Sequence, residues 1–172
     1  MLWTIAWVGC HKAGPEPEVA PEPSEAPAPV DAAEPVAAEV PASRELLYKA
    51  FAVRDGEPVC AEVEALVAEP VPALLDLVRH VSMPPTVPMR AAGCLVERHA
   101  AEVPDELEAW VTTDATRGLA LLVADRVDLL PTDVAVRVTA AAMAGPHAAE
   151  LGPRLAASGR AEVRDAARPA GN

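Results

Sequence analysis

The residues in this chain whose types could carry chemistry are four histidines, three cysteines and several groups of acids. The histidines, at positions 11, 80, 99 and 147, form no HExxH or other dense ligand spacing, whereas a structural zinc site generally needs four ligands. His99 prolongs an apolar helical face, and we interpret it as a hydrogen-bonded histidine in or beside the core. His80 adjoins Arg79 near a helix end, where a favourable interaction with the helix dipole accounts for it. We therefore expect no metal site and no cofactor.

Acids that lie close together in the sequence could act as a general acid and base. The three groups are Glu62 with Glu64, Asp105 with Glu106 and Glu108, and Asp125 with Asp128. Asp105 and Glu106 follow Pro104, in a predicted first helical turn where negative charge suits the helix dipole. We interpret all three groups as solvated helix faces. The sequence also has no glycine-rich phosphate loop, and we expect a protein that is not an enzyme.

Two cysteines, Cys60 and Cys94, lie within the predicted helical part of the chain. Cys60 aligns with Val63 and Val67 on one inward face, and Cys94 flanks the face that carries Leu95. In an exported protein the two could form a disulfide across 34 residues, which would contribute about 3 kcal/mol or more. The alternative is two buried thiols that pack as small apolar side chains. The sequence leaves both alternatives open.

Charge and composition exclude one class of partner. The net charge is −12, and aromatic residues make up 3% of the chain. Residues 1–43 carry seven acids against Lys12 alone, and residues 44–172 carry nineteen acids against thirteen bases. Binding to nucleic acid needs an excess of Lys and Arg to release counterions from phosphates, so we expect no nucleic-acid partner. A core of small aliphatic side chains favours closely packed helices.

The first ten residues, MLWTIAWVGC, run from an apolar stretch into a cysteine. The stretch is too short to span a bilayer, which takes about 20 residues. Val8-Gly9-Cys10 resembles the end of a bacterial lipoprotein signal, in which small residues precede a cysteine that is acylated and becomes the mature N-terminus. The resemblance implies a signal segment over 1–9, and a lipid-anchored protein of the cell envelope held in the bilayer through acylated Cys10. His11 is not the Asp that retains some such lipoproteins in the inner membrane, which favours the outer membrane, facing the periplasm or the cell surface.

The next segment, residues 10–43, is predicted to be a disordered linker. Residues 13–43 hold eight Pro and seven acids, with no basic or aromatic residue. Such a segment cannot bury enough apolar surface to offset the entropy of ordering it. A Pro-rich chain extends by about 3.1 Å per residue, so this Pro/Glu/Ala tether would reach about 95 Å at most. It would hold a helical domain of residues 44–172 away from the membrane.

Residues 44–172 are predicted to be all-α, because apolar residues recur at helical spacing and no alternating strand pattern is present. Ser43 is the predicted cap of a first helix that ends at Arg54-Asp55-Gly56. The apolar faces run over Leu46–Phe51, Val59–Val67, Leu74–Val81, Ala92–His99, Val103–Val111, Leu119–Leu130 and Val134–Ala142. Two short helices separated by Ser158-Gly159 complete the chain.

The longest apolar segment, residues 114–145, is predicted to form two helices folded against each other. Pro131 separates them, because it removes a backbone donor and disfavours helical geometry in the residue before it. Thr132 or Asp133 is the predicted cap of the second helix. That helix is apolar on nearly every side, which indicates burial between neighbouring helices.

An internal repetition indicates the architecture. Apolar-Arg-x-x-small patterns surround Arg90, Arg137 and Arg164, and Arg117 lies in a looser copy. The arginines are 27, 20 and 27 residues apart. The pattern resembles the second helix of short HEAT-type repeats over roughly residues 58–168, which implies a short α-solenoid of HEAT-like helical pairs. In such repeats the arginine bridges adjacent layers through a carboxylate or helix-end carbonyls. The alternative is an irregular α-helical bundle whose matches are accidents of composition.

The functional expectation follows from this organisation. By resemblance, HEAT-like domains are binding scaffolds without chemistry of their own. We expect a membrane-anchored scaffold lipoprotein that presents one helix-lined face to an envelope protein partner. The alternatives are an enzyme accessory or a helical domain that handles a small ligand or cofactor, for which His80, His99 and acids would have to meet in one concave pocket, and a purely structural spacer.

Overall fold

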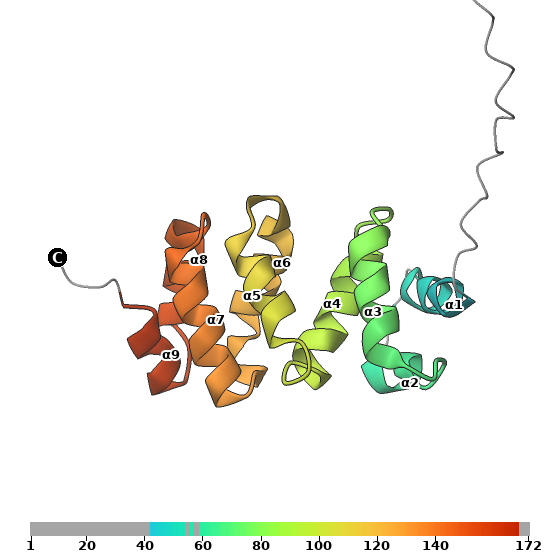
Figure 1. Ribbon diagram of the computed structural model, residues 1–172, viewed down its shortest axis with the longest axis horizontal. Coiled ribbons are helices and arrows are strands. Elements are labelled where there is room, and N and C mark those ends of the chain that lie inside the picture. The colour runs from blue at the N-terminus through green and yellow to red at the C-terminus, as the bar shows by residue number, and fades with distance from the viewer. Residues whose placement is uncertain (1–41, 54–55, 57–58, 169–172) are drawn as a thin grey trace, which may run out of the picture. The chain divides into compact units, whose positions relative to one another are not determined.

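The computed structural model describes residues 42–53, 56 and 59–168, and these residues fold into helices with no strand, which confirms the all-α prediction (Figure 1). The helices are α1 (Ala42–Phe51), α2 (Cys60–Glu64), α3 (Pro70–His80), α4 (Thr86–Arg98), α5 (Pro104–Thr112), α6 (Arg117–Asp125), α7 (Thr132–Ala144), α8 (Ala148–Ala156) and α9 (Ala161–Ala166), with 3-10 turns η1 (Asp114–Thr116) and η2 (Val127–Leu129). The predicted signal segment 1–9, Cys10 and the linker up to residue 41 lie outside the described residues.

Proline sets several helix starts. Pro70 and Pro104 occupy the first turns of α3 and α5, where a missing backbone N–H costs nothing. Pro131 directly precedes α7 as predicted, but the predicted side-chain cap is wrong, because α7 has no side-chain cap hydrogen bond. The Thr132 hydroxyl instead accepts a hydrogen bond from Arg160. The first helix begins at Ala42, one residue before the predicted cap Ser43.

The second predicted helix is shorter than its apolar pattern indicated. α2 has five residues and buries only Val63 and Glu64. Val59 and Leu66, which the pattern placed on an inward face, are exposed. The helix ends at Glu64, and residues 65–68 form turns and bends ahead of α3, which begins at Pro70. Two apolar side chains therefore remain available at the surface beside α2.

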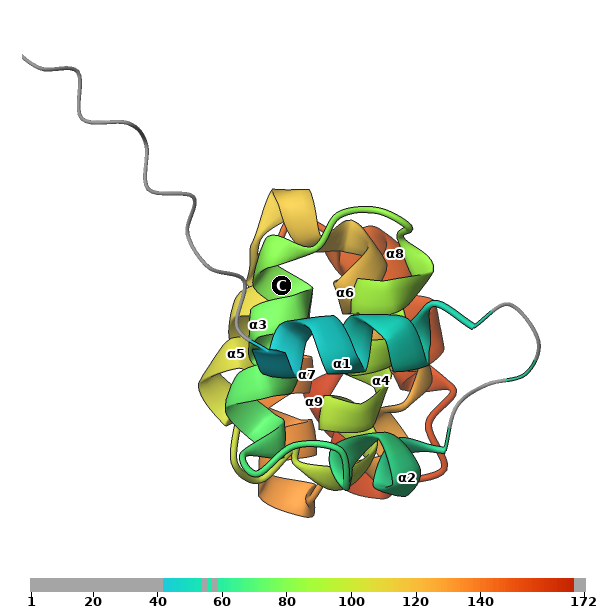
Figure 2. The same ribbon diagram turned by 90° about the vertical axis from the view of Figure 1, so that its right-hand side faces the viewer.

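The central helices do not pack chiefly on each other, contrary to the prediction. α6 packs on α4, α5 and α8, whereas α7 packs on α5, α8 and α9. The burial of α7 between neighbours is therefore as predicted, but its closest neighbour is α5. The six-helix stretch α4–α9 forms two rows, one of α5, α7 and α9 and one of α4, α6 and α8. Figure 2, which looks onto α1, shows α4, α6 and α8 on one side, with α3 and α5 on the other.

Buried positions recur every 28 residues along both rows. One row buries Leu95, Val123 and Leu151, and the other buries Leu107, Ala135 and Val163. Each set lies at equivalent places on successive helices, α4, α6 and α8 in the first case and α5, α7 and α9 in the second. These positions hold only Leu, Val and Ala, so the core is packed with aliphatic side chains.

Candidate functional site

Three ion pairs join the C-terminal ends of successive helices in the α2, α4, α6 and α8 series. The pairs are Arg98 with Glu64, Arg126 with Glu97, and Arg154 with Asp125. The first two have nitrogen–oxygen distances of 2.8 and 3.2 Å. In each pair the arginine reaches back to a carboxylate on the preceding helix of the series. We call this set of six residues the arginine ladder.

The ladder follows the same period as the core. Arg98, Arg126 and Arg154 are 28 residues apart, because the helices that carry them recur at that interval. Glu97-Arg98 and Asp125-Arg126 are matching acid–base dipeptides at the ends of α4 and α6. The Arg126–Glu97 and Arg154–Asp125 pairs are partly exposed to solvent, so each of these two contributes little free energy alone, about 0–1 kcal/mol. The Arg98–Glu64 pair differs from these two, because its carboxylate is buried.

Arg126 packs against one face of α4. Its guanidinium lies over Gly93, where any β-carbon would overlap Nη1. A β-carbon at this buried position would push the tip of the Arg126 side chain away from the α4 backbone. Arg126 in turn meets Glu97 one turn further along α4. The helix therefore presents Gly93 and Glu97 together as the docking face for this arginine.

The four arginines of the predicted repeat divide into two equivalent pairs. Arg90 and Arg117 lie on α4 and α6, whereas Arg137 and Arg164 lie on α7 and α9, in the other row. The two members of each pair are 27 residues apart in sequence. The 20-residue interval separates Arg117 in one row from Arg137 in the other. The prediction that all four mark the second helix of a pair is therefore wrong.

Three of these arginines connect different helices. Arg90 donates to the carbonyls that end α1, to Phe51 at 2.7 Å and Val53 at 2.6 Å. Arg117 pairs with Glu150 of α8 at 2.6 Å. Arg137 pairs with Asp105 at 2.5 Å and with Glu108 at 2.6 Å, both on α5. Arg164 instead donates to the Ser158 carbonyl at 2.8 Å, within the α8–α9 connection.

These contacts shift ionisation in the expected directions. Hydrogen bonding from Arg117 lowers the pKa of Glu150, and the hydrogen bond from Arg44 lowers the pKa of Asp76. The Ser158 hydroxyl and the Gly159 N–H donate to Asp128 and lower its pKa as well. Each of these carboxylates is therefore held in its charged form. An arginine of another helix does this for Glu150 and Asp76, and the α8–α9 connection does it for Asp128.

Most of the acids that were interpreted as solvated faces are paired with arginines of other helices. Glu64 is 7% exposed, and it accepts a hydrogen bond from Arg98. Glu106 accepts from Arg79 and from the Trp110 indole N–H. The interpretation as solvated faces is therefore wrong for Glu64, which is buried, and for the half-buried Glu106. It holds for the exposed Glu62, Asp105, Asp125 and Asp128, of which Glu62 has no partner among the described residues.

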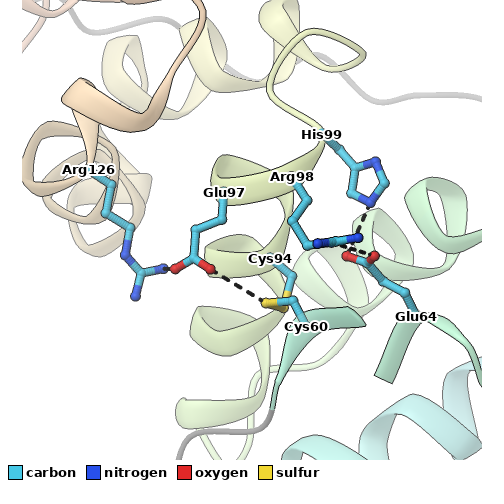
Figure 3. Close-up of a disulfide and its surroundings, with 7 residues drawn as sticks. All are labelled: Cys60, Glu64, Cys94, Glu97, Arg98, His99 and Arg126. Carbon is cyan, nitrogen blue, oxygen red and sulfur yellow. Dashed lines mark hydrogen bonds and ion pairs between the residues drawn. A yellow bond between two sulfur atoms is a disulfide. The ribbon is translucent and has the colours of Figure 1, made fainter. Parts of the chain in front are cut away.

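Cys60 and Cys94 form a disulfide with an S–S distance of 2.05 Å, so the structure has the first of the two alternatives left open by the sequence (Figure 3). The bond ties the start of α2 to the middle of α4. Cys60 Sγ also lies 3.8 Å from Glu97 Oε2. This is a close contact and not a hydrogen bond, because a bridged sulfur carries no proton.

The other end of α2 is held by Glu64, as Figure 3 shows. Arg98 Nε donates to one carboxylate oxygen at 2.8 Å, and His99 Nε2 lies 3.1 Å from the other. The His99 contact has ion-pair distance without hydrogen-bond alignment, so both atoms lack a hydrogen bond. His99 Nδ1 lies 2.7 Å from Glu102 Oε1. α2 is thus fixed to α4 by a covalent bond at its start and by a charged cluster at its end.

A surface hollow of about 380 Å³ lies between α2 and η2, and we call it the α2–η2 hollow. It is lined by Val59, Cys60, Ala61, Glu97, Arg98 and Leu129. Val59 and Leu129 are 56% and 57% exposed, among the most exposed large apolar side chains of the described residues. The sequence analysis missed this site, because it placed Val59 on a buried face and gave no role to Leu129. No signal in the sequence brings the two residues together.

The three histidines in the described part of the chain do not converge on one site. His80 lies against Asp76, with Nδ1 2.9 Å from Oδ1, whereas His99 has Glu64 and Glu102 as neighbours. His147 is buried with Nε2 unpaired. No group of three or more His, Cys, Asp or Glu in the described ranges is placed to hold a metal ion.

Basic and acidic side chains of the described residues differ in how completely they are paired. Each Lys and Arg in the described ranges has a hydrogen-bond or ion-pair partner within the protein. Five carboxylates have none among the described residues, namely Glu62, Glu69, Asp114, Asp133 and Glu162. A partner's carboxylate would therefore have to compete for each cation, whereas a partner's cation meets unpaired acids.

Comparisons of this chain with protein-family models, curated proteins and solved structures found no match. Within the described part of the chain, no helix combines the length and apolarity needed to cross a bilayer.

Proposed function

We propose that this protein is a lipid-anchored scaffold of the bacterial cell envelope, whose helical domain binds a protein partner. Two features of the sequence support the anchor: the apolar stretch that runs into Cys10, and the acidic Pro-rich segment after it. That segment would hold the domain away from the membrane that carries the acyl chains. The outer membrane, with the domain facing the periplasm or the cell surface, is the proposed location.

We further propose that the domain is a short solenoid of HEAT-like helical pairs. The support is the 28-residue period shared by the buried positions and the arginine ladder. Repeats of this kind contact only their neighbours and leave a long face for binding. An irregular bundle would need no common period for its core and its ion pairs.

The observation that carries the binding role is the α2–η2 hollow. Its exposed apolar walls, Val59 and Leu129, stand beside a helix that a disulfide fixes in place. Exposed apolar side chains beside a fixed helix favour binding, because a partner that covers them removes apolar surface from water and orders little of the protein. The spacer alternative gives no reason for a fixed apolar hollow.

The anchor is tested by fractionation of cells that make the full chain or its Cys10→Ser variant. Acylation at Cys10 predicts that the protein moves to the membrane fraction only when the cysteine is present, and that mass spectrometry finds acyl chains on it. Membrane association that persists unchanged in the Cys10→Ser variant would remove the lipoprotein proposal.

The binding role is tested with the detergent-extracted full chain as bait on its own envelope fraction. A captured protein must then be purified and must bind the full chain with a saturable, 1:1 isotherm in calorimetry. If no envelope protein meets this criterion, the scaffold proposal fails, and the small-ligand and enzyme-accessory alternatives take its place.

A further inference from the structure

The α2–η2 hollow has the features of a receptor for one side chain. Val59 and Ala61 line it from the α2 side, Leu129 lines it from η2, and Glu97 and Arg98 line it from α4. The disulfide sulfur of Cys60 adds a polarizable apolar surface to the lining. Both walls leave more than half of a large apolar side chain in solvent, so an apolar group placed between them would remove surface from water on two sides.

The charged side chains around the hollow determine which charge is favourable on a partner residue next to the bound side chain. Arg98 is bonded to Glu64, and Arg126 is paired with Glu97. Glu62, which follows Ala61 on α2, is exposed and unpaired. The five charged side chains therefore comprise three carboxylates and two guanidinium groups. A cation beside the hollow would gain a carboxylate partner, whereas an anion there would meet only guanidinium groups that already have one.

Long-range electrostatics act in the same direction. Residues 44–172 carry nineteen acids against thirteen bases, and their described surface has five unpaired carboxylates. Such a field attracts basic segments and speeds their encounter with the protein.

We propose that the α2–η2 hollow binds an extended protein segment through one aliphatic or aromatic side chain, with a Lys or Arg beside it that pairs with Glu62. This inference rests on the proposed binding function and gives the face and the chemistry of the partner. The apolar side chain lies between Val59 and Leu129, and the flanking cation lies on the α2 side.

The first test uses peptides as probes and the disulfide-intact full chain, observed through its methyl NMR signals. The probes are Ac-Gly-Lys-Leu-Lys-Gly-NH2, its Glu-Leu-Glu counterpart, and a Lys-Ser-Lys counterpart without the apolar group. The Lys-Leu-Lys peptide is expected to give saturable shifts at Val59 and Leu129, with weaker binding of the other two. Absence of saturable shifts, or equal binding of the acidic peptide, overturns the proposal.

Two pairs of variants test the walls and the charge. Leu129→Ser is expected to weaken Lys-Leu-Lys binding by about fivefold or more. Leu46→Ser is the matched control, because Leu46 is 48% exposed on α1, outside the hollow. Glu62→Lys should weaken binding and Glu162→Lys should not, since both carboxylates are exposed and unpaired but only Glu62 directly follows a lining residue of the hollow, Ala61. Equal effects within either pair would contradict the proposal.

A second test separates this inference from the proposed function. The envelope partner captured by the full chain is titrated with wild type, Leu129→Ser and Leu46→Ser. Weaker binding of Leu129→Ser alone supports the hollow as the receptor. Equal affinity for all three proteins overturns the hollow while the scaffold function stands, and the lack of any saturable partner removes the scaffold function itself.

Discussion

Thr139 offers the sharpest test of how this core is built. The residue is completely buried in α7, and its hydroxyl oxygen has no hydrogen-bond partner. In the 28-residue period its equivalents are Val111 and Ala167, which are buried and apolar. The hydroxyl therefore occupies an apolar position, and Thr139→Val replaces it by a methyl group of nearly the same shape.

The magnitude follows from the cost of an unpaired buried hydroxyl, about 1–3 kcal/mol. Val and Thr have similar helix propensities, so the change in α7 itself is small. We expect Thr139→Val to raise the free energy of unfolding by at least about 1 kcal/mol. For a domain of this size, that corresponds to an increase in melting temperature of about 3–5 °C.

The assay is urea and thermal unfolding of the disulfide-intact full chain, followed by circular dichroism. Thr112→Val is the matched control, because Thr112 is exposed in α5 and its hydroxyl donates to the Glu108 carbonyl at 2.8 Å. Its expected change is within about 0.5 kcal/mol. A Thr139→Val protein that is no more stable than wild type would refute the reasoning. That result would mean that the Thr139 hydroxyl of the wild-type protein has a hydrogen-bond partner in solution.

Three further predictions concern the contacts between helices. Reduction of Cys60–Cys94 should lower the free energy of unfolding by about 3–4 kcal/mol, from the 34-residue separation that the bond closes, as measured by urea unfolding with and without dithiothreitol. Arg137→Ala should lower the melting temperature only slightly, by at most about 3 °C, because its two ion pairs are solvent-exposed. Asp128→Asn should reduce stability at neutral pH but not at low pH: since the Ser158 hydroxyl lowers the pKa of Asp128 in the folded state, the stabilisation is complete above about pH 4 and is lost as pH falls through the lower folded value.

Each of these predictions has a matched control. Dithiothreitol should not change the unfolding of a Cys60→Ala/Cys94→Ala protein. Arg168→Ala removes an exposed ion pair within one turn of the chain, with Asp165, and should have less effect than Arg137→Ala. Asp133→Asn alters an unpaired carboxylate and should leave the acid limb of the pH profile unchanged. An effect of the control as large as that of its variant would contradict the corresponding argument.

The helices were predictable because their signals are local. The apolar spacing of Leu107, Trp110 and Val111 identifies α5, and Pro104 identifies its start. The end of α2 was not predictable, because Leu66 continues the apolar pattern while the backbone has already left the helix. Periodicity reports which residues could share a face, whereas tertiary packing decides which face is covered.

The candidate site was harder to predict, for a different reason. The partners in the arginine ladder are 29 to 34 residues apart, and nothing in one sequence links Arg126 to Glu97 before the helices are stacked. Spacing alone suggested four equivalent arginines, but Arg117 and Arg137 belong to different rows. Even the α2–η2 hollow depends on η2, which places Leu129 at the surface opposite Val59.

The direction of the arginine ladder bears on how the chain is made. Each ladder arginine lies later in the sequence than its carboxylate, as in Glu64 before Arg98 and Asp125 before Arg154. A polypeptide that leaves the ribosome or an export channel N-terminus first therefore releases every ladder acid ahead of its cation. In all three ladder pairs the carboxylate has therefore already emerged when its arginine does, so the order of synthesis matches the order in which the pairs can form.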